Sequence, residues 1–223
     1  MSLSRLLFIC AAHQAVSVFG LEAAAPCTQP LLDPEHCCIK KAPSIFNATF
    51  STTAGPFTLT ITRSAAPLGV DRFYNLVYYG YFGNETMAGN EGGFFRYVPD
   101  FVVQFGIAGM PSVSAAWNTP PIKDDPVVMS NTQGTIAFAT AGPNTRTTQV
   151  YINLKDNSGL DAQGFAAFGR VTAGFDVLAK GVYQGYGGDP DQDLIYSQGD
   201  VYLHKSFPKL SYTLSTTLAT VEA

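Results

Sequence analysis

Charged side chains are scarce in this sequence of 223 residues, at 13% of the total, and this scarcity favours an extracellular or luminal protein. The formal net charge of −4 argues against a basic nucleic-acid-binding surface and against a polybasic membrane patch. Histidine occurs only as His13, His36 and His204, and no cysteine follows Cys38. The stretch 44–203 therefore has no thiol nucleophile, no histidine base and no His/Cys metal cluster. We expect no metal and no cofactor.

The first twenty residues are typical of a secretory signal peptide. Arg5 supplies a positive charge, and an apolar run interrupted at positions 13–14 follows up to Phe19. We place cleavage after Gly20, with the small residues at 23–25 as the rival site. The run is too short and too interrupted for a membrane-spanning helix, which needs about 20 apolar residues. We expect a protein of the secretory pathway, either in the ER lumen or secreted, with no membrane association.

Three cysteines remain after that cleavage, and all lie in the N-terminal segment 21–43: Cys27, Cys37 and Cys38. An oxidising compartment favours a disulfide among them. Adjacent cysteines rarely bond to each other, so the predicted bridge joins Cys27 to either Cys37 or Cys38. One thiol is left over in either case.

From residue 44 the apolar residues recur with a period of two. The runs 46–50 and 57–61 alternate apolar with polar residues, and the Ala54-Gly55 pair between them predicts a hairpin turn. Apolar residues at i, i+3, i+4 and i+7 predict two amphipathic helices, over 70–77 and 175–182. Further strands are predicted over 93–98, 101–107, 135–140, 148–153, 166–171 and 201–203. The pattern indicates one mainly β domain over 44–212, with helices packed on a closed or nearly closed sheet, and a flexible tail over 213–223.

Two segments of this domain carry unusual polar residues. In Phe94–Gly106, Arg96 stands among apolar strand formers, where a buried guanidinium needs a partner. Val102 and Gln104 have the same parity and so share one face of a strand. In Phe138–Ile152, Gln149 and Tyr151 likewise share one face. Two strands of this kind predict an apolar pocket with a few polar points.

The same segments resemble the cyclophilins, a family of peptidyl-prolyl cis-trans isomerases. Residues 94–106 match the motif F-x-R-x-x-P-x-F-x-x-Q-x-G, and residues 141–152 match A-G-P-N-T-x-x-x-Q-x-F/Y-I. Residues 160–171 are similar to the form L-D-x-x-G-F-x-P-F-G-x-V. The resemblance covers residues from about 45 to about 212. It implies a closed eight-stranded antiparallel β-barrel with two α-helices, and an enzyme that rotates X–Pro bonds in proline-containing peptides and folding proteins.

Position by position, the resemblance also implies the site. Arg96 takes the place of the catalytic arginine, Gln104 holds it and contacts the substrate backbone, and Phe101 completes the catalytic set. The resemblance implies that the pocket for the proline ring is lined by Phe101, Val102, Tyr151, Leu160 and Phe165. The groove for the residues that precede proline is implied to be bordered by Ala139, Thr140 and Gln149. Gly159 stands where the resemblance places a Trp important for cyclosporin binding, so we expect weak inhibition by cyclosporin.

Two other interpretations stay open at this point. The same groove could serve a proline-peptide binding module without useful turnover, although a pure binder need not keep Arg96. The unpaired thiol could mediate association of a structural protein, but we expect a monomer. The sequons at Asn47 and Asn84 predict glycosylation, with Asn47 on the outward face of its strand.

Overall fold

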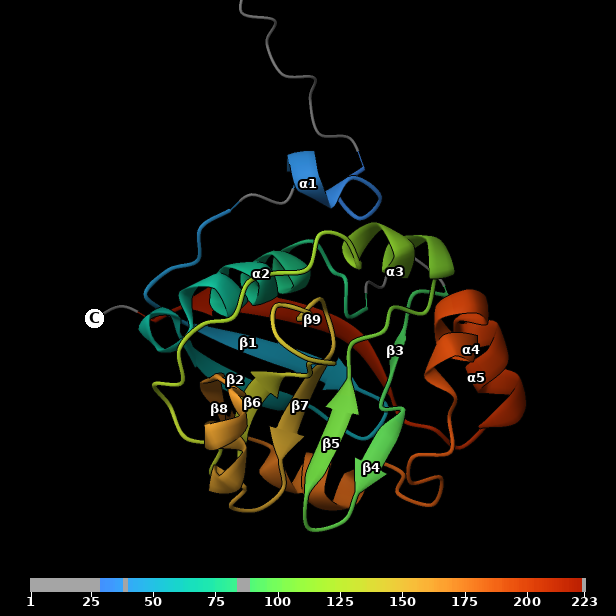
Figure 1. Ribbon diagram of the computed structural model, residues 1–223. Coiled ribbons are helices and arrows are strands. Elements are labelled where there is room, and N and C mark those ends of the chain that lie inside the picture. The colour runs from blue at the N-terminus through green and yellow to red at the C-terminus, as the bar shows by residue number, and fades with distance from the viewer. Residues whose placement is uncertain (1–28, 38–39, 84–88, 222–223) are drawn as a thin grey trace, which may run out of the picture.

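The computed structural model describes residues 29–37, 40–83 and 89–221, and its main feature is one curled sheet (Figure 1). Its strands are hydrogen-bonded in the order β3-β9-β1-β2-β8-β6-β7-β5-β4, and all these pairings are antiparallel. The bounds are β1 Ile45–Thr52, β2 Phe57–Thr62, β3 Gly92–Gly93, β4 Arg96–Val98, β5 Val102–Phe105, β6 Thr135–Phe138, β7 Val150–Asn153, β8 Ala167–Ala173 and β9 Tyr212–Thr220. The predicted mainly β antiparallel fold is confirmed.

The two ends of this strand order come from neighbouring parts of the chain. β3 pairs with β9 and β4 pairs with β5, and only residues 94 and 95 separate β3 from β4. One short segment therefore joins both edges of the curled sheet, which leaves few unpaired edge groups. The expected closed barrel of eight strands is only approximate, because the sheet of the described residues has nine strands. The predicted strand over 93–98 is divided into β3 and β4, which lie at the two edges of the sheet.

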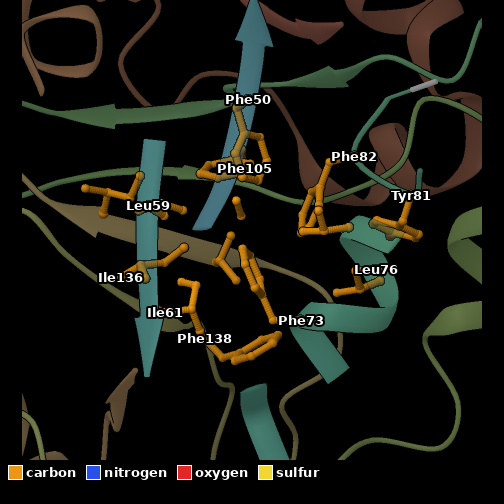
Figure 2. Close-up of a cluster of buried hydrophobic side chains, with 14 of the residues drawn as sticks. Phe50, Leu59, Ile61, Phe73, Leu76, Tyr81, Phe82, Phe105, Ile136 and Phe138 are labelled. Atoms are coloured by element: carbon orange, nitrogen blue, oxygen red, sulfur yellow. The ribbon is translucent and has the colours of Figure 1, made fainter. Parts of the chain in front are cut away.

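The core fills the inside of the curled sheet with aromatic rings. The β1–β2 hairpin is confirmed, since Phe50 pairs with Phe57 across it and the two rings stack at 4.8 Å between centroids. Phe105 from β5 and Phe82 meet Phe50 at centroid distances of 5.8 and 5.5 Å. Figure 2 shows Phe50, Phe105 and Phe82 gathered in this core, with Phe73 between them and the side chains of Ile61 and Phe138. Such ring pairs add to the stabilisation that comes from the buried area itself.

Both predicted helices have a counterpart in the structure. The first is α2, Pro67–Tyr78, which lies across one end of the sheet and buries Val70, Phe73, Leu76 and Val77 on one face (Figure 1). The second is a short turn that continues as the π-helix Val177–Gly181, with Leu178 buried. The described residues also form α1 Pro34–Cys37, α3 Pro111–Trp117, α4 Gln192–Gln198 and α5 Asp200–Ser206.

Two sequence predictions about the C-terminal part are wrong. Residues 201–203 were expected to form a strand, but they lie in α5, because a short apolar run fits a strand and a helix equally well. Residues 213–223 were expected to form a flexible tail, but β9 extends to Thr220 and pairs with β1 from Thr52 to Phe46. Threonine is a strand former, and the ladder needs only backbone groups, so the polar composition was misleading.

The N-terminal segment packs against the domain rather than apart from it. Asp71 and Asn75 of α2 accept hydrogen bonds from the backbone amides of Ala42 and Lys40, at 2.8 and 3.1 Å. Leu31 and Ala42 belong to the main core. The boundary placed at residue 44 therefore marks a change of periodicity and not a gap in packing. The predicted signal peptide, residues 1–20, lies outside the described residues.

In the ranges 29–37, 40–83 and 89–221, no helix is long and apolar enough to cross a membrane.

Candidate active site

Arg96 and Gln104 stand opposite each other on the adjacent strands β4 and β5. They are register partners, and Arg96 Nη1 donates to Gln104 Oε1 at 3.1 Å. Arg96 is half-buried and Gln104 is 8% exposed. A guanidinium carries five N–H donors in a rigid fork, so the bond to Gln104 orients the group without using up its capacity to donate. The structure thus brings together the two polar residues of the first motif.

The amide of Gln104 continues this chain of hydrogen bonds to the second motif. Gln104 Nε2 donates to Gln149 Oε1 at 2.7 Å. Gln149 Nε2 in turn donates to Gln192 Oε1 at 3.0 Å and to the hydroxyl of Tyr196 at 2.8 Å. Gln192 and Tyr196 belong to α4, which was not among the predicted parts of the site. No motif or periodicity in residues 189–199 signals this contact, because it depends on where α4 packs.

Next to Gln104 lies a cluster of apolar side chains that is separate from the main core and that we call the apolar pocket. It consists of Val102, Ala137, Tyr151 and Ala167, which are buried, and of Phe101, Met129, Ala139, Leu160 and Phe165, which are only partly buried. Because these five side chains are partly exposed, the cluster reaches the protein surface, unlike the closed main core. All five residues predicted to line a proline pocket lie in it. Ala137, Ala167 and Met129 were missed; Met129 follows a Pro-rich stretch without periodicity and reaches the pocket by an isolated bridge to Ala167.

Two contacts hold the side chain of Tyr151 in this pocket. Its hydroxyl donates to Asn131 Oδ1 at 2.9 Å, and its ring meets Phe165 edge-on at 5.9 Å between centroids. Asn131 is fully buried and donates its own amide to Asp161 and to the backbone oxygen of Phe165. Burial raises the pKa of the Tyr151 hydroxyl, so the group stays neutral. The network fixes the ring and also ties the 158–165 segment to the pocket.

A second hollow, which we call the polar cavity, adjoins the apolar pocket at Ala139. Its volume is about 460 Å³. Its walls are amides, hydroxyls and methyl groups from Gln104, Asn118, Ala139, Thr140, Ala141, Thr145, Thr147, Gln149, Gln192 and Tyr196. The three residues expected to border a groove, Ala139, Thr140 and Gln149, all lie on it.

The loop that forms one wall of the polar cavity is anchored by a buried ion pair. Arg146 is 3% exposed, and its Nη2 lies 3.1 Å from Asp125 Oδ2. The Asp125 carboxylate also accepts hydrogen bonds from the backbone amides of Leu68 and Gly69, at the start of α2. A carboxylate at a helix N-terminus is favourable because amide groups there lack partners within the helix. No motif or periodicity in the sequence predicts this pairing of Arg146 with Asp125.

The remaining predicted residues are three cysteines and two asparagines, of which the structure describes Cys37 and Asn47. Cys37 is disulfide-bonded, but Cys27 and Cys38 lie outside the described residues, so the pairing stays a prediction. Asn47 is half-buried and accepts from Thr60 Oγ1 at 2.8 Å, while Asn84 lies outside the described residues. In the part of the chain that the structure describes, no three His, Cys, Asp or Glu side chains gather as a metal site would require.

The arrangement can bind a ring and place a cation beside it. An apolar pocket with one fixed phenol and one oriented guanidinium can hold an apolar five-membered ring and offer hydrogen bonds to atoms next to the ring. The polar cavity adjoins this pocket at Ala139, and Gln104 forms part of its wall. A peptide could therefore lie across both hollows, with different side chains in each.

Comparisons with known proteins agree with this geometry. Residues 47–192 match the family model described as cyclophilin type peptidyl-prolyl cis-trans isomerase/CLD. A peptidyl-prolyl cis-trans isomerase A of Dickeya dadantii is 34% identical over 136 residues, which are 58% of this chain and 67% of that protein. The peptidyl-prolyl cis-trans isomerase cyp18 of Streptomyces antibioticus is 32% identical over 146 residues, or 60% and 83% of the two chains.

Solved structures give the same result for the fold. A cyclophilin type peptidyl-prolyl cis-trans isomerase from Cryptosporidium parvum superposes with a TM-score of 0.54 at 16% identity, covering 80% of this chain and 99% of that one. The family model spans more than half of the chain and includes Arg96, Gln104 and Gln149. The chain therefore belongs to the cyclophilin type peptidyl-prolyl cis-trans isomerase family.

Proposed function

We propose that this chain is a peptidyl-prolyl cis-trans isomerase that assists protein folding in the secretory pathway. The observation that carries the activity is the position of the Arg96 guanidinium, which Gln104 orients at 3.1 Å beside the apolar pocket. The family membership supports the same reaction. The substrate is an X–Pro peptide bond, whose cis and trans forms are close in energy but interconvert slowly.

The reaction requires rotation about a C–N bond that resonance makes partly double, with a barrier of about 18–20 kcal/mol. In the twisted state the nitrogen of proline becomes pyramidal and regains its lone pair. A guanidinium N–H of Arg96 that points at this nitrogen stabilises the twisted state more than the planar one, which lowers the barrier. No bond is formed with the protein, and no proton has to be transferred.

The other residues then have distinct roles in this mechanism. The apolar pocket holds the proline ring still, with Phe101 and Phe165 on its partly exposed side and the ring of Tyr151 fixed by Asn131. Gln104 positions Arg96. The acyl side of the peptide bond can then turn while the ring does not, so that rotation is confined to the bond that must isomerise.

Two observations support the secretory pathway. The first twenty residues have the order of a signal peptide, with a positive charge before an apolar run. Cys37 is disulfide-bonded, and disulfides persist mainly in oxidising compartments. We further propose that Asn47 and Asn84 carry glycans, which a mass shift after endoglycosidase treatment and its loss in Asn84→Gln and Asn47→Gln would test.

A protease-coupled assay with an alanine-proline tetrapeptide tests the activity. The expected result is a faster cis-to-trans phase in proportion to enzyme concentration. Binding of the peptide without any acceleration would instead identify a proline-peptide binding module. N-terminal sequencing of the protein recovered from the medium or the ER lumen tests the route, and a first residue of Leu21 is expected; an intact Met1 in a cytosolic fraction would contradict it.

A further inference from the structure

A segment far from the family motifs in sequence forms one wall of the groove. The chain between the π-helix and β9 passes Arg96, where a Cβ added to Gly188 would lie 3.7 Å from Arg96 Cγ. It then forms α4, whose Gln192 and Tyr196 line the polar cavity and bond to Gln149. We propose that α4 determines substrate specificity, by making the polar cavity accept a neutral hydrogen-bonding side chain, preferably an amide, from a residue that precedes the proline. This inference rests on the proposed isomerase function.

The direction of the hydrogen bonds explains why α4 is needed. A guanidinium can only donate, so Gln104 must turn its oxygen to Arg96 and its NH₂ group to the next amide. Gln149 must then accept with its oxygen and present its own NH₂ group outward. That NH₂ group needs acceptors, and α4 supplies two, Gln192 Oε1 and the Tyr196 hydroxyl. α4 thus ends the chain that starts at Arg96, and it fixes which way each amide faces the cavity.

The walls of the polar cavity favour neutral polar groups over charged ones. Among its ten lining residues there is no carboxylate, ammonium or guanidinium group. Burial raises the pKa of Tyr196, so its phenol is neutral at physiological pH and can both donate and accept. A charged side chain entering such a cavity would lose water without gaining a counter-charge, whereas an amide would find donors and acceptors. A volume of about 460 Å³ is enough for one such side chain.

α4 is held firmly enough to act as a wall. Its N-cap residue Asp191 accepts from the backbone amides of Asp193 and Leu194 at 2.9 and 3.1 Å. Ile195 is fully buried in a further hydrophobic cluster, which also contains Phe95 and Leu203. α5 follows directly, and its first amide, on Asp200, donates to the carbonyl of Gly109 at 2.9 Å. The pair of helices α4 and α5 is therefore bonded to the segment that precedes α3. The C-cap residue of α3, Asn118, also lines the cavity.

The test compares proline tetrapeptides that differ in one residue. Gln, Glu, Lys and Ala are placed in turn at each of the two positions before proline, and kcat/KM is measured in the protease-coupled assay. At one of these positions we expect the Gln peptide to be turned over about tenfold faster than the Glu and Lys peptides, a modest discrimination for a site that is open on one side. The ratio of two peptides does not depend on the fraction of folded enzyme, so loss of stability alone cannot change it.

Variants of α4 connect this preference to the wall. The double variant Gln192→Leu with Tyr196→Phe removes both acceptors, and its Gln-to-Glu ratio should fall to about threefold or less, as expected when hydrogen-bonding partners are lost. Ser197→Ala is the matched control, since Ser197 is exposed on the same helix and does not line the cavity. Equal turnover of Gln and Glu peptides, or an unchanged ratio in the double variant, would overturn the inference. No turnover of the Ala peptide would instead overturn the proposed function on which it rests.

Discussion

The apolar pocket and the polar cavity adjoin at Ala139, yet different forces shape them. The four buried side chains of the pocket lie on the paired strands β5, β6, β7 and β8, and the five partly buried ones lie outside these strands. Van der Waals contacts between apolar groups set the form of the pocket. The cavity combines strand residues with the 140–147 loop, the end of α3 and α4, and directional hydrogen bonds through Gln149 set its form.

The difference indicates how each hollow should respond to change. A ladder of strands keeps its side chains in place even when one of them is shortened, because the backbone bonds remain. A chain of amides depends on every member, since one wrongly turned amide leaves a donor or an acceptor without a partner. We therefore expect affinity for proline to be robust and selectivity for the preceding residues to be sensitive.

The largest effect is expected at Arg96, which Gln104 orients beside the apolar pocket. Arg96→Ala should lower kcat/KM by about a hundredfold, the loss typical of removing one oriented donor to a transition state. The thermal midpoint should change little because Arg96 is half-buried at the surface of the groove. Arg170→Ala serves as control, since Arg170 is exposed on β8. Turnover like that of the wild type in Arg96→Ala would contradict the proposed mechanism.

The stability of the fold should depend on pH because of Asp200, which begins the helix α5 next to α4. This side chain is 4% exposed, accepts from the amide of Glu91 at 3.0 Å, and lies so close to Gly109 that any side chain there would clash. Burial raises the pKa of Asp200 to about 7. Between pH ~4 and ~7 the folded state thus keeps a proton that the unfolded chain has released, so the free energy of unfolding should fall as pH rises through this window.

Asp200→Asn removes that titration. At pH 8 we expect the variant to be more stable than the wild type by about 2 kcal/mol, and at pH 5 the difference should be much smaller. Urea unfolding at both pH values measures it, and Asp193→Asn on the exposed side of α4 is the control. A gain of equal size at both pH values would show that the carboxyl group does not titrate in this window.

The rim of the apolar pocket should respond to an added side chain. Gly159 is exposed, and a Cβ there would meet nothing within 4 Å, so a large residue fits without rearrangement. We expect weak inhibition of the wild type by cyclosporin, and Gly159→Trp should bind cyclosporin about tenfold more tightly, through the apolar contact and donor of the indole. Gly159→Ala separates the effect of the ring from that of the backbone. Potent inhibition of the wild type would contradict the role assigned to this position.

A smaller effect is expected inside the apolar pocket. Tyr151→Phe removes the hydroxyl that bonds to Asn131, and the free energy of unfolding should fall by about 1 kcal/mol. Turnover of the alanine-proline peptide should stay close to that of the wild type, because the ring and its contact with Phe165 remain. Tyr78→Phe, on the exposed side of α2, controls for the loss of a phenol. A large loss of turnover would show that the hydroxyl itself takes part in the reaction.

The smallest effect on activity is expected from reduction of the disulfide at Cys37. Residues 29–37 and 40–43, the described part of the N-terminal segment, line neither the polar cavity nor the apolar pocket. They lie near the end of α2, where the C-cap residue Tyr79 donates to the backbone oxygen of Cys37. If the partner is Cys27, the bridge closes a loop of only about ten residues and stabilises by about 3 kcal/mol at most. Activity and Tm with and without a reductant measure this, with mass spectrometry of alkylated thiols to identify the partner. Loss of turnover on reduction would place the segment within the catalytic unit.

The sequence was sufficient for one of the two hollows. The parity of Val102 with Gln104, and of Gln149 with Tyr151, predicted which side chains share a strand face, and Gln104 and Gln149 do bond to each other. The resemblance to the cyclophilins assigned Arg96 to the same site, and Arg96 bonds to Gln104. Successive side chains of a strand point to opposite faces, so the sequence itself shows which side chains share a face. The hairpin and α2 were predictable for the same reason.

The sequence by itself determined the antiparallel β architecture, the family and the apolar pocket, because these follow from patterns within short stretches. Only the tertiary structure decided that β9 pairs with β1, that Arg146 and Asp125 anchor the loop, and that α4 reaches Gln149. Each of these is a contact between residues far apart in the chain, made by a backbone ladder or by a few polar atoms. Such contacts leave no periodicity in the sequence, since their energy depends on where two distant segments meet and not on the order of residues within either.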